Sequence, residues 1–343
     1  MSQQAMRICA FIAFLLLSSL VQAGTGLAEL PAAQQDGPVT VFYPSSDPDR
    51  PLQRGPFNLN LALNGTPARG NGRLVILSHG SGGAAWPHSD LARQLVQAGF
   101  VVALPEHQGD NWKDMAKVGP PSWKLRPAEV SRAIDAVGRD ARFAPLLDLT
   151  RVGVFGMSAG GHTALTFAGG RWSPSKLLRH CELHIDDDFQ TCVGLASSLT
   201  GTILDSVKKA VAMWLIRQRL ADETWYRHDD VRVRAVVAEV PFAADFDLAT
   251  LAHPSAALGI VRAGQDQWLL ARFHSDAVLK VCASCERVAD LPLAGHGSLL
   301  SPPPPGLGGL VAKLLADPKD FDRNQVPLAH AAIASFFSRH LLP

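Results

Sequence analysis

Val152-Gly153-Val154-Phe155-Gly156-Met157-Ser158-Ala159-Gly160-Gly161 is the stretch that decides the fold of this chain. A run rich in β-branched residues enters the pattern G-x-S-x-G, and the residues that follow, 161–167, have helical character. Because Gly156 and Gly160 have no side chains, the backbone can bend sharply between strand and helix. Such a bend would hold the hydroxyl of Ser158 in a strained position on top of a sheet. The stretch therefore predicts a strand, a nucleophile elbow and a helix.

Strand-like runs recur before and after the elbow, with helical patterns between them. Several runs are continuous rather than alternating, which is typical of strands buried on both faces. The strand-like runs are 39–43, 74–78, 100–104, 152–155, 233–238, 258–261 and 288–291. The stretches with helical spacing are 89–98, 127–139, 267–281 and 326–340. This alternation predicts an α/β fold with a doubly wound, mostly parallel sheet, whose functional residues lie at the carboxyl ends of the strands.

The segment 171–230 interrupts this rhythm directly after the elbow helix. It contains a predicted helix from about Ile203 to Leu220, on which apolar residues share one face. These residues are Ile203, Val207, Val211, Trp214 and Leu215. Two interpretations stay open. Either the segment covers the functional site as a lid or pocket wall, or the helix packs this face on the core.

The first 23 residues have the composition of a secretory signal peptide. Arg7 provides a basic start, 8–21 are apolar, and Val21-Gln22-Ala23 is a small-residue cleavage site. The apolar run is shorter than a membrane-spanning helix, and an uncleaved anchor is the alternative. We expect an exported protein, periplasmic or secreted, with residues 24–343 as one mature domain and no stable membrane insertion after cleavage.

An even number of cysteines follows this segment, in a compartment that allows disulfides. The local pairings are Cys181 with Cys192 and Cys282 with Cys285. A zinc site is the alternative for the first pair, but its spacing matches no standard structural motif. Its ligands would be His180, Cys181, His184 and Cys192. We expect two disulfides and no metal.

The charge balance excludes several classes of function. The chain has 32 Lys and Arg against 31 Asp and Glu, so the mature domain is near neutral. The sequence has neither a basic patch that would indicate a nucleic-acid partner nor an acidic tail that would indicate a charge-driven partner. The glycine-rich stretch Gly80–Gly83 is not followed by the Lys-Ser or Lys-Thr of a phosphate-binding loop. We expect no cofactor.

The chain downstream of Ser158 offers the two other members of a serine-based catalytic triad. A serine hydroxyl needs a base within hydrogen-bond reach, and the base needs an acid to orient it. In folds with this elbow the order along the chain is Ser, then Asp or Glu, then His. Asp266 follows the strand-like run before Gly264, and His296 follows the run that ends at Leu291. We predict Ser158 as nucleophile, Asp266 as acid and His296 as general base.

Other residues compete for these roles. Asp266 could instead cap the helix that follows it, and His296 could be an ordinary loop histidine. His162 precedes the acids in the chain and is expected to pack on the elbow helix. The alternative acids, in order of preference, are Glu239, Asp245 and Asp247.

A tetrahedral intermediate also needs backbone donors for its oxyanion. The stretch Ser78–Gly83 begins where a strand-like run ends, and its glycines allow the backbone to approach the site closely. We predict the N–H groups of Ser81 and Ala159 as the oxyanion donors.

Seven short segments carry a resemblance to a known family. They are 39–44, 78–83, 105–110, 126–130, 156–161, 263–266 and 294–296. With these segments the chain resembles an α/β-hydrolase of the predicted dienelactone-hydrolase group, which is related to platelet-activating-factor acetylhydrolases and other secreted esterases. The family pattern carries Asp266, whereas in the acetylhydrolase relatives the acid follows the earlier strand, near Glu239. Dienelactone hydrolases proper have a cysteine at the elbow, where this chain has Ser158.

The resemblance and the triad imply hydrolysis of small-molecule carboxylic esters through an acyl-enzyme, without cofactor or metal. A lipase or phospholipase A2-like acetylhydrolase would use the same triad with an apolar acyl channel, and a serine peptidase would share the nucleophile. A non-catalytic binding module that retains the hydrolase fold is the alternative from another class.

Overall fold

The computed structural model describes residues 24–33 and 36–343, and the expected signal segment, 1–23, lies outside the described residues. Its centre is a ten-stranded sheet with the order β10-β9-β8-β7-β5-β6-β2-β1-β4-β3. The strands are β1 (Gly24–Leu30), β2 (Val39–Ser45), β3 (Arg50–Arg54), β4 (Phe57–Leu63), β5 (Leu74–Ser78), β6 (Val101–Pro105), β7 (Val152–Met157), β8 (Val233–Glu239), β9 (Ala257–Ala263) and β10 (Glu286–Leu291). From β10 to β6 every neighbouring pair is parallel. The predicted α/β fold with a mostly parallel sheet is confirmed.

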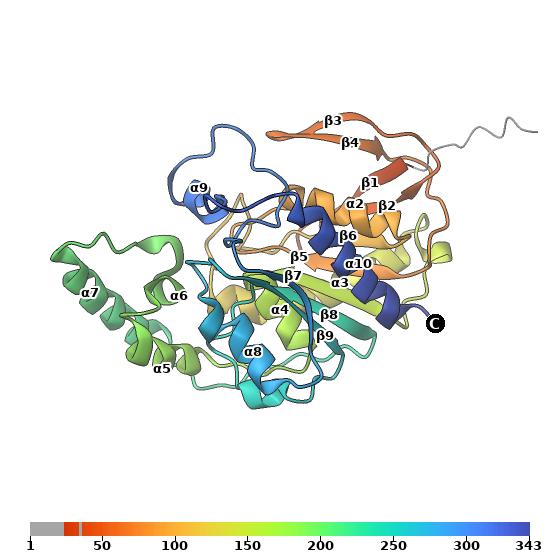
Figure 1. The fold of residues 1–343 in the computed structure, drawn as a ribbon. Coiled ribbons are helices and arrows are strands. Elements are labelled where there is room, and N and C mark those ends of the chain that lie inside the picture. The colour runs from red at the N-terminus through yellow and green to blue at the C-terminus, as the bar shows by residue number, and fades with distance from the viewer. Residues whose placement is uncertain (1–23, 34–35) are drawn as a thin grey trace, which may run out of the picture.

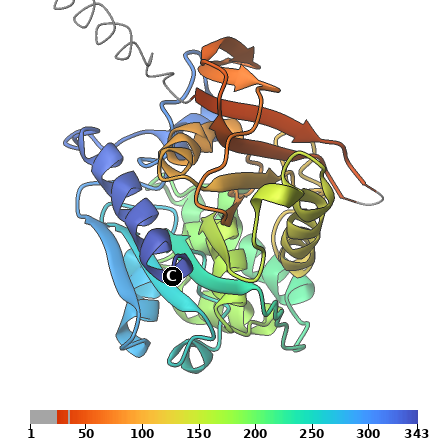
Figure 2. The ribbon, with the colours of Figure 1, turned by 90° about the vertical axis from the view of Figure 1, so that its right-hand side faces the viewer.

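Helices cover both faces of the sheet (Figures 1 and 2). Helices α2 and α10 pack on one face, and α3, α4 and α8 pack on the other. The helices are α2 (Ser89–Gln97), α3 (Pro120–Arg139), α4 (Ala159–Phe167), α5 (Pro174–His184), α6 (Phe189–Val193), α7 (Leu204–Arg219), α8 (Ser275–Val281), α9 (Gly309–Leu315) and α10 (Gln325–Leu341). In the part of the chain that the structure describes, no helix has both the length and the apolar character that a bilayer crossing requires.

The central strands contact apolar side chains on both faces. Every residue of β5, β6 and β7 is buried. Along β7, Val154 enters the core beneath α3 and α4, whereas Phe155 enters the core beneath α2 and α10. A strand between two cores needs a continuous apolar sequence, so these runs were recognisable.

The sheet reverses its direction of growth at β5. The chain passes from β5 to β6 on one side and then returns to the other side of β5 as β7. The register pairs Ser78, the last residue of β5, with Gly156 of β7. The loop after β5 and the elbow after β7 therefore meet at a topological switch point, where open α/β sheets form their sites.

Strands β1, β3 and β4 lie outside the predicted runs. In β4 the apolar residues Phe57, Leu59 and Leu61 alternate with polar asparagines, the period of a half-exposed strand. Strand β3 contains Pro51, which is tolerated because β3 is at the edge of the sheet. Strand β1 contains two glycines, which weaken a strand signal, and it is held by antiparallel pairing with β2.

Two predicted helices have other limits in the structure. Helix α3 begins at Pro120 rather than at Pro127, because two prolines suit a first turn whose N–H groups have no helical acceptor. The predicted helix 267–281 is reduced to a short 3₁₀ turn and α8. The carboxylate of Asp266 accepts the N–H groups of Trp268 and Leu269, as an N-cap does, but the residues up to Leu270 stay irregular.

Helices α5, α6 and α7 form a segment that projects beyond the sheet (Figure 1). Cys181 of α5 and Cys192 of α6 form a disulfide with an S–S distance of 2.15 Å, and Cys282 and Cys285 form a second at 1.94 Å. Both expected pairings are present. Since Cys181 and Cys192 are bonded to each other, their thiolates are not available as the zinc ligands of the alternative interpretation.

Helix α7 exposes the apolar face that one interpretation placed on the core. The exposed fractions are 92% for Ile203, which directly precedes the helix, 58% for Val207, 52% for Val211 and 60% for Trp214. Leu215, at the border of this face, is half-buried. The buried residue of α7 is Ile216, on the opposite side of the helix. The core-packing interpretation of this face is therefore wrong. It fails because the projecting segment carries α7 away from the sheet, so only the side that faces α5 and α6 finds partners.

Candidate active site

Ser158 lies at the tip of the elbow between β7 and α4 and is partly exposed. Its backbone has φ 58° and ψ −116°, a strained conformation for a residue with a side chain. The glycines allow neighbouring backbones to come close. A Cβ on Gly156 would lie 1.9 Å from Gly160 O, and a Cβ on Gly160 would lie 1.9 Å from Ser78 O. The Ser158 N–H donates to Glu239 O at 3.0 Å, which ties the elbow to the end of β8.

Asp266 and His296 come together from the ends of β9 and β10. His296 Nδ1 lies 2.7 Å from Asp266 Oδ2, and both side chains are buried. The other carboxylate oxygen, Asp266 Oδ1, accepts the N–H groups of Trp268 and Leu269 at 2.8 and 2.9 Å. These local bonds resemble the capping role that competed with the triad assignment, yet they leave Oδ2 for the imidazole. Asp266 thus fixes the ring of His296 and is itself fixed by the backbone.

The predicted triad also requires a hydrogen bond between Ser158 and His296, and this structure does not contain it. Among the hydrogen bonds of residues 24–33 and 36–343, none joins Ser158 Oγ to the imidazole of His296. Hydrogen bonds between nucleophile and base are often long in the absence of substrate and shorten in the complex. The chain order and the strand ends bring the two residues to the same edge of the sheet.

The rival acids have other surroundings. Asp245 Oδ2 lies 3.0 Å from His162 Nε2, and both side chains are fully buried. His162 also stacks on Trp123 at 4.7 Å between ring centroids, in keeping with the expected packing role. Asp247 pairs with the exposed Arg171 at the surface. Burial raises the pKa of Glu239 to about 8, which is the reverse of what an orienting anion requires at neutral pH.

The buried carboxyl of Glu239 predicts a pH dependence of stability. The unfolded chain releases this proton near pH 4.5 and the folded protein near pH 8, so the free energy of unfolding falls as the pH rises between these values, by up to about 1.4 kcal/mol per unit. Glu239→Gln removes this contribution. Urea unfolding at pH 5, 6.5 and 8 should therefore show the variant gaining stability relative to the wild type as the pH rises. A difference that is constant with pH would contradict the assignment.

The loop after β5 lies against the nucleophile. A Cβ on Gly80 would lie 3.4 Å from Ser158 Cβ and 3.2 Å from Met157 Sδ. Within the described residues, neither the Ser81 N–H nor the Ala159 N–H has a hydrogen-bond acceptor. Ala159 is also the first residue of α4, where the helix dipole favours negative charge. Both predicted donors are therefore free for an oxyanion.

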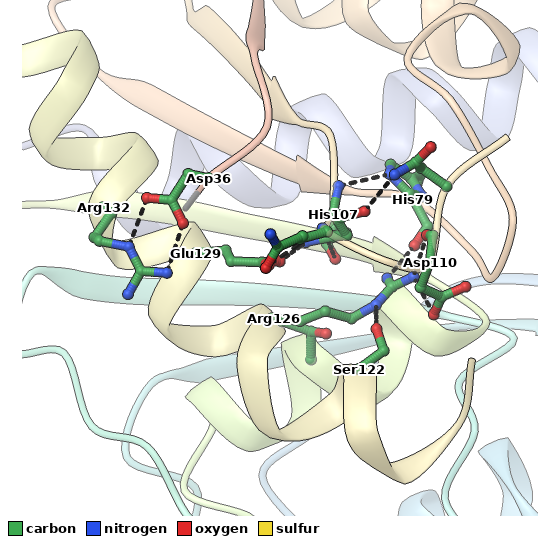
Figure 3. A network of polar contacts seen from close by, with 12 residues as sticks. Asp36, His79, His107, Asp110, Ser122, Arg126, Glu129 and Arg132 are labelled. Atoms are coloured by element: carbon green, nitrogen blue, oxygen red, sulfur yellow. Dashed lines mark hydrogen bonds and ion pairs between the residues drawn. The ribbon is translucent and has the colours of Figure 1, made fainter. Parts of the chain in front are cut away.

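A second serine, histidine and carboxylate chain lies behind this loop. Ser78 Oγ is 2.8 Å from His107 Nε2, and His107 Nδ1 is 2.6 Å from Glu129 Oε2 (Figure 3 shows the histidine and the carboxylate). Ser78 and His107 are fully buried and Glu129 is nearly so. A substrate cannot reach this serine. These three hydrogen-bonded residues therefore support the loop and are not a second site. Within the described residues, no group of three His, Cys, Asp or Glu side chains is arranged to hold a metal ion.

Sequence reasoning did not assign a role to two residues of this region, Arg126 and Asp110. Their side chains form a fully buried ion pair at 2.8 Å. Both belong to segments that carry the family resemblance, but their spacing in the sequence does not pair them. The available signal was Arg126 itself, a charged residue on an apolar helix face. Arginine is almost never fully buried without a partner, so a buried acid could have been expected.

No family model matches this chain, and no curated protein matches it in sequence. Among solved structures it is similar to a ferulic acid esterase from Streptomyces cinnamoneus, with a TM-score of 0.54 and 17% sequence identity. The alignment covers 94% of this chain and 91% of that one. At this identity the likeness establishes a shared fold over nearly the full length.

Proposed function

We propose that this protein is a serine hydrolase that cleaves carboxylic esters through an acyl-enzyme. The observation that carries the proposal is the buried hydrogen bond between His296 and Asp266, at the same sheet edge as the strained, partly exposed Ser158. A serine at the same sheet edge as an imidazole held by a fixed carboxylate has the components of an activated nucleophile. The solved neighbour is named as an esterase, which supports the same class of reaction.

In the proposed mechanism His296 accepts the proton of Ser158 as Oγ attacks the ester carbonyl. Asp266 stabilises the imidazolium that forms, and its backbone hydrogen bonds keep it in place. The N–H groups of Ser81 and Ala159 donate to the oxyanion. His296 then returns the proton to the leaving alcohol, and a water molecule repeats the cycle on the acyl-enzyme with His296 as base.

The substrate class we propose is a soluble, small-molecule ester, and we infer that the protein is exported, to the periplasm or beyond. The two disulfides support an oxidising compartment. A second candidate is hydrolysis of lipid esters with the projecting segment as a lid. It is favoured by the exposed apolar side chains of α7, which would contact an aggregated substrate.

A panel of esters tests the reaction class and separates the two candidates. Residues 24–343 should hydrolyse p-nitrophenyl acetate and butyrate below their solubility limit with a kcat on the order of 1–10³ s⁻¹. Methyl ferulate belongs in the panel because of the neighbour's name. Activity that rises steeply only above the critical micelle concentration of a longer ester would favour the lipid candidate. No hydrolysis of any ester above the buffer rate would contradict the proposal.

A further inference from the structure

The loop after β5, Ser78–Gly83, is held from behind by one fully buried guanidinium. Arg126 on α3 donates from Nη1 to His79 O at 2.5 Å and from Nη2 to Gly80 O at 3.4 Å. Its Nε donates to Ser122 Oγ at 2.9 Å, one turn earlier on the same helix. Figure 3 shows Arg126 between the helix and the loop. The guanidinium thus orients two consecutive peptide carbonyls towards α3.

The orientation of a carbonyl fixes the next N–H. In a trans peptide the C=O and the following N–H point in opposite directions. Gly80 O also accepts the Gly83 N–H at 3.1 Å and lies 2.8 Å from His79 Nδ1. With Gly80 O bound on the side of Arg126, the Ser81 N–H is turned away from α3. This is the N–H that has no acceptor among the described residues and that we propose as an oxyanion donor.

The tautomer of His79 supports the same orientation. Its Nε2 accepts the backbone N–H of His107 at 3.3 Å, so the proton of the neutral ring is on Nδ1 and is donated to Gly80 O. Burial, then the neighbouring His107 and the charge of Arg126, hold the pKa of His79 well below its ordinary value. The ring is therefore neutral, and it acts with Arg126 on one carbonyl.

Asp110 completes the arrangement from the other side of the loop. Its Oδ1 accepts the Gly82 N–H at 2.9 Å, and its Oδ2 accepts Ser81 Oγ at 3.2 Å and the guanidinium of Arg126 at 2.8 Å. The carboxylate therefore occupies the Gly82 N–H and leaves the Ser81 N–H available. Burial alone would raise the pKa of Asp110, but the Arg126 charge and the Gly82 hydrogen bond lower it below its ordinary value. The pair stays charged where an unpaired charge would be costly.

We propose that Arg126, paired with Asp110, is a positioning residue that preorganises the oxyanion hole by fixing the peptide between Gly80 and Ser81. The inference rests on the proposed function, since it assumes a Ser158-centred acyl transfer. Its effect is exerted on the transition state, because a free N–H that is held in place costs no reorganisation when the oxyanion forms. Substrate binding in the ground state depends on it far less.

Arg126→Lys tests this role, because lysine keeps the charge but has one compact head in place of the planar fork. We expect kcat on p-nitrophenyl butyrate to fall about 100-fold, the cost of losing one oxyanion donor, with KM changed less than about threefold. Affinity for butylboronic acid, whose tetrahedral serine adduct mimics the oxyanion, should fall in the same proportion. The matched control is Arg132→Lys on the same helix, where a part-exposed arginine binds Asp36 through two bonds of 2.6 Å. The control should keep kcat and boronate affinity within about twofold.

Active-site titration with a fluorophosphonate separates positioning from folding. In Arg126→Lys the final labelled fraction should match the wild type while the labelling rate falls. A reduced labelled fraction with wild-type kcat per labelled site, or an unchanged kcat, would overturn the inference. If Arg126→Lys does not fold, Asp110→Asn replaces it, with an expected loss in kcat of about tenfold, and wild-type kcat in that variant overturns the inference as well. If the proposed function itself is wrong, the result is different: Ser158→Ala keeps full esterase activity.

Discussion

Ser158→Ala is expected to lower kcat on p-nitrophenyl butyrate by about 10⁵–10⁶-fold, with little change in KM. In the proposed mechanism the substitution removes the one atom that forms the covalent bond to the acyl group, so the acyl-enzyme cannot form. The residual rate over water comes from the oxyanion donors, which the variant retains. Initial rates measured with enzyme at high concentration would resolve a residual activity of this size.

The control for Ser158→Ala is a serine that does not contact the site. Ser338 is on α10, and its Oγ donates to Ala334 O at 2.9 Å within the helix. Ser338→Ala should keep kcat and KM within about twofold of the wild type. Equal kcat in Ser158→Ala and the wild type would contradict the assignment of Ser158 as nucleophile, regardless of the result for Ser338→Ala.

Asp266→Asn has the second largest expected effect, a fall in kcat of about 10⁴-fold. The asparagine has nearly the same shape, but its amide cannot stabilise the imidazolium of His296 and does not select the tautomer that leaves Nε2 free to accept a proton. The local bonds from Trp268 and Leu269 need only an oxygen acceptor, so one orientation of the amide preserves them. A kcat loss with an unchanged melting temperature is therefore expected.

Glu239→Gln is the matched comparison for the acid. Its carboxyl is buried and makes no hydrogen bond to a histidine among the described residues, so its kcat should stay within about threefold of the wild type. The reverse pattern, with activity kept in Asp266→Asn and lost in Glu239→Gln, would move the acid to the end of β8. The same Gln variant is used to measure stability against pH, so it tests both the identity of the acid and the pH dependence of stability.

Local patterns made the centre of this fold predictable. Strands β5 to β9 lie between two apolar cores, and their continuous apolar runs are hard to mistake. The elbow needs glycines at Gly156 and Gly160, because neither position has room for a Cβ. Asp266 and His296 could be selected because each follows a strand-like run at a glycine turn, which places them at the carboxyl edge in the order that the fold requires.

The rest depends on contacts between residues that are distant in the sequence. Arg126 and Asp110 are paired by the way in which α3 lies beneath the loop after β5, and no periodicity encodes that contact. The apolar stripe of α7 has the pattern of a core-facing helix, yet the projecting segment turns Val207 and Trp214 outwards. Strand β4 did carry its alternating signal at Phe57–Leu63, but without a neighbouring helix it did not fit the β–α rhythm on which the prediction relied.

The most direct test of the central claim is the position of a covalent adduct. Residues 24–343 labelled with a fluorophosphonate and analysed by intact mass and peptide mapping should carry one adduct per chain, on Ser158, and Ser158→Ala should carry none. An adduct on another residue, or no adduct in a preparation that hydrolyses esters, would contradict the claim that Ser158 is the nucleophile of this protein.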